Sequence, residues 1–123
     1  MKITLIRHGR TIGNVKGCFN GVTNDPLCDD GVETIKEYVE KGIYPEVGIV
    51  VSSPLKRCLQ TSNLIYPQHK PIVVDNLREI NFGDFENKTH LQLENNPDYI
   101  RWIKSNGTSD IPNGESFKAF TAR

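Results

Sequence analysis

The sequence predicts an α/β fold, in which helices connect the strands of a sheet. Short apolar runs at residues 2–6, 47–52 and 72–74 are typical of strands. The second is a continuous apolar run, as expected of a strand buried on both faces, and the third is also predicted to be buried. Helical patterns follow the first two runs, at residues 29–42 and from residue 53 onward. This alternation of strand and helix favours a sheet with crossover helices.

The first predicted helix spans residues 29–42. Asp30 with Glu33 three positions later has the pattern of a capping box, and Gly42 suits the position just after a helix end. The apolar positions that fall on one face of this helix are Val32, Ile35, Tyr38 and Val39.

The second helix is predicted to begin after Ser53, which can cap it, with Pro54 in its first position. The side chains expected to face the core are Leu55, Cys58, Leu59 and Ile65.

Beyond the third strand, residues 77–86 are expected to form a loop. A short helix is predicted near Thr89, where Gln92 completes a capping box, and another at Asn96-Pro97. The side chains that the latter helix should bury are Tyr99, Ile100, Trp102 and Ile103.

A last helix is predicted from Glu115-Ser116, with Phe117 and Phe120 three residues apart. It reaches Arg123 without a Gly, Asn or Pro stop signal. We therefore expect residues 1–123 to be the N-terminal part of one domain.

Composition excludes several classes of function. The 123 residues hold 15 Lys+Arg and 15 Asp+Glu, and this net charge of zero argues against a nucleic-acid-binding protein. No apolar stretch approaches the roughly 20 residues of a membrane helix, and the first one is too short for a signal peptide. The sequence therefore predicts a cytoplasmic protein without a membrane partner. Cys18, Cys28 and Cys58 form no CxxC pair and are expected to be free thiols.

Residues that can carry chemistry follow the predicted strands. Arg7-His8-Gly9 comes directly after the first strand, and ligands gather at the carboxyl ends of strands in α/β sheets. Arginine can bind phosphate oxygens with two N–H groups, and histidine can act as a base, a nucleophile or a metal ligand. Arg57 follows the second strand and Glu79 the third. On their own, these residues could equally be solvated surface groups.

Taken together, a series of short blocks resembles the N-terminal part of the histidine phosphatase superfamily, the cofactor-dependent phosphoglycerate mutase-like proteins. The likeness runs from about residue 2 to residue 120, and it implies a three-layer sandwich with a mostly parallel sheet flanked by helices, incomplete at the C-terminus. The blocks are Arg7-His8-Gly9 with Thr11 and Asn14, Gly21, Pro26-Leu27, Gly31, Ser52-Ser53-Pro54 with Arg57 and Thr61, Leu77-Arg78-Glu79, Phe82-Gly83 with Glu86, and Pro112 followed by Gly114-Glu115-Ser116.

The resemblance implies a mechanism. His8 would be the nucleophile that forms a phosphohistidine, and Glu79 the general acid for the leaving alcohol. The residues that would hold the phosphoryl oxygens are Arg7, Asn14 and Arg57, and candidate substrate-binding residues are Gly21, Glu115 and Ser116. Phosphoryl transfer needs mainly positioning and cationic donors, so no metal and no other cofactor is expected.

The chain also departs from the family pattern. The family has a second histidine, in a His-Gly motif on a later strand, whereas this chain has only His8, His69 and His90. We interpret the last two as solvated surface residues. An unpaired strand edge invites association or swapping, so the isolated chain is expected to be impaired, and a homo-oligomer remains open. Smaller departures are Cys28 in place of Thr, Phe85 in place of Trp and Asn87 in place of Gly.

Within the superfamily, the compact run 77–86 and the absence of a long insertion after Arg57 are more similar to small phosphatases than to mutases. Among these the chain resembles the α-ribazole phosphatases of cobalamin synthesis. The expected activity is hydrolysis of a small phosphomonoester, such as α-ribazole-5′-phosphate. The alternatives are phosphoryl transfer of the phosphoglycerate mutase type, and a non-catalytic relative that only binds phosphate.

Overall fold

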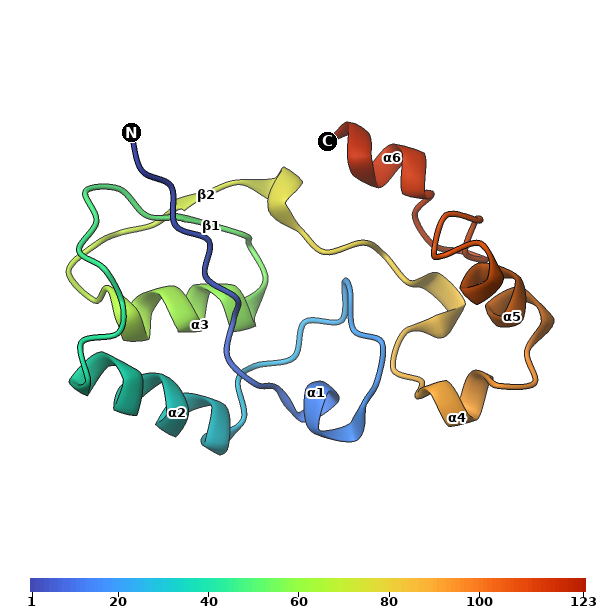
Figure 1. Ribbon diagram of the computed structural model, residues 1–123, viewed down its shortest axis with the longest axis horizontal. Coiled ribbons are helices and arrows are strands. Elements are labelled where there is room, and N and C mark those ends of the chain that lie inside the picture. The colour runs from blue at the N-terminus through green and yellow to red at the C-terminus, as the bar shows by residue number, and fades with distance from the viewer.

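The computed structural model describes residues 1–123 and confirms the mixed α/β class (Figure 1). In chain order the elements are α1 (Ile12–Lys16), α2 (Asp29–Glu40), β1 (Val51–Ser52), α3 (Lys56–Ile65), β2 (Ile72–Val73), the 3-10 helices η1 (Asp75–Leu77) and η2 (Gly83–Phe85), α4 (His90–Leu93), α5 (Pro97–Lys104) and α6 (Phe117–Ala122).

The sheet consists of two parallel strands joined by the crossover helix α3, as the alternation of elements predicts. Val51 pairs with Ile72 and Ser52 with Val73, so β1 and β2 are shorter than the predicted runs. The strand predicted at residues 2–6 is wrong, because residues 1–8 make no backbone hydrogen bond to another backbone group. An extended segment becomes a strand only when a neighbour completes its ladder, and β1 pairs with β2 alone.

Burial of the strands also differs from the prediction. Ser52 is buried, but Val51 and Ile72 are 51% and 56% exposed. Helix α3 contacts β1, and α2 packs on α3 rather than on the sheet. No helix or strand covers the face of the sheet opposite α3. The apolar side chains on that face therefore remain exposed to solvent.

Helix α2 ends as predicted but begins differently. Gly42 has φ +65°, and its N–H donates to the Val39 carbonyl, so it terminates the helix in the left-handed conformation. The capping box of Asp30 and Glu33 is wrong, since the N-cap is Cys28 and no side chain caps this end. Because the helix starts one residue before Asp30, that carboxylate lies in the first turn.

Helix α3 begins two residues later than predicted. The N-cap is Leu55 rather than Ser53, and Pro54 lies outside the helix. The backbone N–H of Lys56 donates instead to the side-chain oxygen of Asn24, at 2.8 Å. A side chain from a distant loop thus replaces the local cap.

The later helices follow their sequence signals. Thr89 and Gln92 form the predicted reciprocal capping box, and Asn96 caps α5 ahead of Pro97. The hydroxyl of Ser116 accepts the N–H of Ala119 at the start of α6.

Helix α1 was not predicted, although Thr11 and Asn14 form a capping box there. The third-position residue is Asn rather than the usual Glu or Gln, which is why the pattern is easily missed.

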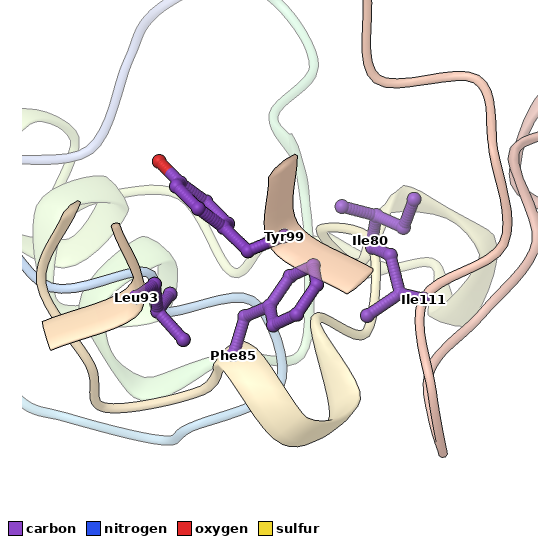
Figure 2. Close-up of a cluster of buried hydrophobic side chains, with 5 residues drawn as sticks. All are labelled: Ile80, Phe85, Leu93, Tyr99 and Ile111. Carbon is purple, nitrogen blue, oxygen red and sulfur yellow. The ribbon is translucent and has the colours of Figure 1, made fainter. Parts of the chain in front are cut away.

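Two apolar clusters form the core. Leu27, Ile35, Ile65 and Tyr66 join α2 to α3. The second cluster, shown in Figure 2, holds the C-terminal half together and consists of Ile80, Phe85, Leu93, Tyr99 and Ile111. Several predicted core positions are instead substantially exposed, because the helices carrying them lie at the surface: these are Tyr38, Val39, Ile100 and Ile103.

Three further features bear on function. No helix is long and apolar enough to cross a membrane. The three cysteines are free thiols. No group of three or more His, Cys, Asp or Glu side chains is placed to hold a metal ion.

Candidate active site

His8 is placed with a free ring nitrogen. It is half-buried at the end of the N-terminal segment, and its Nδ1 lies 2.7 Å from the carbonyl oxygen of Gly9. When the Nδ1–H donates to that carbonyl, Nε2 keeps its lone pair. Burial lowers the pKa of His8 below its ordinary value of 6.5, and the charges of Arg57 and Arg7 lower it further, although the Gly9 hydrogen bond and the charge of Glu79 oppose this. The imidazole is therefore neutral near pH 7, as a nucleophile must be.

Gly9 next to it is held by packing. Its N–H donates to the hydroxyl of Thr61 at 3.0 Å, and a Cβ at this position would lie 2.6 Å from the Ile35 side chain. The small residue therefore lets the His8 segment approach α2 and α3 closely.

Arg57 is almost fully buried, with 3% of its surface exposed. Its Nη1 donates to the Thr23 carbonyl, and its Nη2 donates to the carbonyls of Gly21 and Asn20. These bonds use three of the five guanidinium N–H groups, so two remain available for an anion. The positive charge of this guanidinium lowers the pKa of His8.

Arg7 and Asn14 both present unused donors. Arg7 is exposed and makes no hydrogen bond or ion pair. The side-chain oxygen of Asn14 accepts from the N–H and the hydroxyl of Thr11, which leaves its amide N–H₂ without a protein partner. Such donors suit phosphate oxygens.

Glu79 lies in an exposed segment after β2. Its carboxylate accepts the N–H of Ile80 at 2.8 Å, and its charge reaches His8. It lines a pocket of about 250 Å³ whose only apolar wall is Val22. The other lining residues are Arg78, Asn81, Gly114, Glu115 and Arg123.

The three candidate substrate-binding residues have clear structural contacts. A Cβ on Gly21 would lie 1.7 Å from the carbonyl oxygen of Ile80, so this position requires close backbone approach. Ser116 caps α6, and Glu115 is paired with Arg123 at the wall of the Glu79 pocket. Of the three, only Glu115 lines that pocket.

His69 and His90 lie outside this cluster. His69 is half-buried and edge-on to Tyr66, which corrects its interpretation as solvated. His90 is exposed as expected, although its Nδ1 lies within hydrogen-bond distance, 2.9 Å, of the Tyr99 hydroxyl.

Two residues near the site were not singled out for their function. Glu86 belongs to a sequence block but had no assigned role, and its carboxylate accepts four N–H groups and a hydroxyl. Arg123 belongs to no family block, yet its guanidinium contacts the segment of Glu79. Apart from Phe82, which is four residues from Glu86, the partners are 44 or more residues away, so no local pattern marks these contacts.

A family model and several known proteins match this chain. The model of the histidine phosphatase superfamily (branch 1) matches residues 3–123, so the chain belongs to this superfamily. It is 32% identical to the adenosylcobalamin/alpha-ribazole phosphatase of Salmonella typhimurium over the whole chain, which spans 63% of that protein.

Solved structures show the same fold. The alpha-ribazole phosphatase of Shigella flexneri is 31% identical with a TM-score of 0.82, and the match covers 95% of this chain and 60% of that one. The protein TTHB049 of Thermus thermophilus is 31% identical with a TM-score of 0.80, covering 95% and 65%. The chain thus spans less than two thirds of the length of these relatives.

Proposed function

We propose that the protein containing this chain hydrolyses phosphomonoesters through a phosphohistidine at His8. The observation that carries the proposal is the hydrogen bond that engages Nδ1 of His8 and leaves Nε2 free, in an imidazole whose pKa is lowered by burial and by the charges of Arg57 and Arg7. A neutral nucleophile under the influence of cationic groups matches the demands of phosphoryl transfer. The superfamily and the names of its similar members support the same activity.

In the first step, Nε2 of His8 attacks the phosphorus atom and the bond to the alcohol oxygen breaks. Protonated Glu79 gives its proton to that oxygen, so the alcohol leaves neutral. Water then attacks the phosphohistidine and gives one proton back to the Glu79 carboxylate, which releases inorganic phosphate and restores His8. The spare N–H groups of Arg57 and Asn14 donate hydrogen bonds to the phosphoryl oxygens, and the positive charges of Arg57 and Arg7 offset the negative charge there.

The substrate we favour is α-ribazole-5′-phosphate. The proteins named alpha-ribazole phosphatase are among the similar sequences and structures. The polar lining of the pocket beside Glu79 suits a hydroxylated leaving group such as a ribose.

The test is to trap the intermediate in the whole protein. After mixing with ³²P-labelled phosphomonoester and an alkaline quench, we expect acid-labile label on the wild type and on His69→Ala. His8→Ala should carry no label and lose turnover by several orders of magnitude. Label that persists in His8→Ala would overturn the assignment. Turnover of α-ribazole-5′-phosphate, compared with that of other monoesters, tests the substrate.

A further inference from the structure

The segment that carries Glu79 depends on two distant residues for its position. Residues 75–79 are all exposed, so packing does little to fix them. Every hydrogen bond that joins residues 75–81 to a distant part of the chain goes to Glu115 or Arg123. An exposed segment with so few anchors would otherwise sample many conformations.

Arg123 contacts this segment at Asn76 and at Glu79. Its Nη1 donates to the carbonyl of Asn76, and its Nη2 donates to the carbonyl of Glu79 itself at 3.3 Å. The same guanidinium donates two hydrogen bonds to the Glu115 carboxylate, from Nε to Oε1 at 2.7 Å and from Nη2 to Oε2 at 3.0 Å. Its Cζ also lies 5.0 Å from the centre of the Phe120 ring, which restricts its rotation.

Glu115 completes the attachment on the other side of Glu79. Its Oε2 accepts the N–H of Asn81 at 3.3 Å, and its own N–H donates to the Asn81 carbonyl at 2.9 Å. Both side chains of the Arg123–Glu115 pair are less than one-fifth exposed, so solvent screens the pair less than a surface ion pair.

From these contacts we propose that Arg123 is a positioning residue for Glu79, acting with Glu115 as a clamp on residues 76–81. The clamp holds the Glu79 carboxyl group where it can protonate the leaving oxygen, and this role rests on the proposed function. Geometry of this kind matters because a general acid must lie within hydrogen-bond reach of its target. The hydrogen bond between them lowers the pKa of Glu115 and raises that of Arg123, so the pair stays ionised at neutral pH.

The kinetic experiment compares Arg123→Ala with Arg123→Lys in the whole protein. Arg101→Ala is the matched control, since Arg101 forms an exposed pair with Asp98 and does not line the Glu79 pocket. For Arg123→Ala, kcat on an alkyl phosphomonoester should fall by about tenfold to a hundredfold, while kcat on p-nitrophenyl phosphate stays within about threefold. Lysine keeps the charge without the fork, so its loss should be intermediate. Equal losses on both esters would overturn the proposal.

Amide hydrogen exchange gives a readout that does not depend on activity. The N–H of Ile80 donates to the Glu79 carboxylate, so its exchange reports on that side chain directly. We expect faster exchange at Ile80 and Asn81 in Arg123→Ala and unchanged exchange in Arg101→Ala. Unchanged protection at Ile80 in Arg123→Ala would refute the clamp. If the wild type hydrolyses neither ester, the proposed function fails, and the exchange result alone decides the clamp.

Discussion

Arg57 and Glu86 bind the same loop, residues 20–23, through complementary backbone groups. The guanidinium of Arg57 donates hydrogen bonds to the carbonyls of this loop, and the carboxylate of Glu86 accepts hydrogen bonds from its N–H groups. The shared peptide segment fixes the orientation of the Arg57 guanidinium, whose charge lowers the pKa of His8. A residue in the C-terminal half therefore positions a candidate phosphate ligand on α3.

Replacing Glu86 by Gln should loosen this loop. The amide group offers one acceptor oxygen and turns a donor toward the N–H groups of Gly21, Val22 and Thr23. We expect the free energy of unfolding to fall by about 2–4 kcal/mol, measured by urea denaturation of the whole protein. Glu37→Gln, which breaks only an exposed pair with Lys41, should leave the free energy of unfolding nearly unchanged. Similar effects of both substitutions would contradict the role of Glu86.

Arg57→Ala should weaken the binding of inorganic phosphate by about 2–4 kcal/mol and lower turnover together, because the spare guanidinium N–H groups are lost. Titration calorimetry measures the first effect directly. Arg101→Ala is the control, since Arg101 is exposed and pairs with Asp98. Unchanged phosphate affinity in Arg57→Ala would show that these N–H groups do not face the anion.

The acid limb of the pH profile of kcat/KM should lie below pH 6.5. The lowered pKa keeps His8 neutral, and so nucleophilic, at pH values where an ordinary imidazole is protonated. Removing a positive neighbour favours the charged form, so Arg7→Ala should raise the pKa and move the limb to higher pH. NMR titration of His8 measures the same shift, and Arg10→Ala should leave it in place. A downward shift in Arg7→Ala would contradict the electrostatic account.

Glu79→Gln should affect alcohol leaving groups more than phenolic ones. A phenolate departs without much protonation, so only the alkyl ester needs the acid. We expect about a hundredfold loss of kcat on an alkyl phosphomonoester and a much smaller loss on p-nitrophenyl phosphate. Glu94→Gln, an exposed position at the end of α4, serves as the control. Equal losses on the two esters would rule out the acid role.

Residues 1–123 expressed alone should self-associate and show little activity. The exposed apolar side chains along the sheet include Ile49, 71% exposed, and Val51, 51% exposed, and β1 has one unpaired edge. Sedimentation equilibrium should detect association, and the double substitution of Ile49 and Val51 by Lys should reduce it. Ile103→Lys, at an exposed position on α5, should have no effect. A monomer with the full activity of the whole protein would disprove this expectation.

Local signals in the sequence were sufficient to predict where many of the helices begin or end. The capping box of Thr89 and Gln92, the Asn96 cap and the left-handed Gly42 all involve partners within a few residues. Asn87, at a position where the family commonly has Gly, adopts φ +60°, which asparagine tolerates. The predicted capping box of Asp30 and Glu33 is wrong because helix α2 begins at Asp29, one position earlier. Asp30 is therefore inside the helix rather than at its N-cap.

The sequence by itself determined the α/β class, most of the helices and the residues that mark the superfamily, because short-range patterns and motif blocks carry this information. Only the tertiary structure decided that residues 2–6 remain unpaired, since strand formation depends on a neighbour. It also decided the partners of Arg57 and Arg123, which bind carbonyls 36 and 44 residues away, at Gly21 and Glu79. Backbone carbonyls are present at every residue, so no sequence pattern can specify which of them a buried guanidinium will bind.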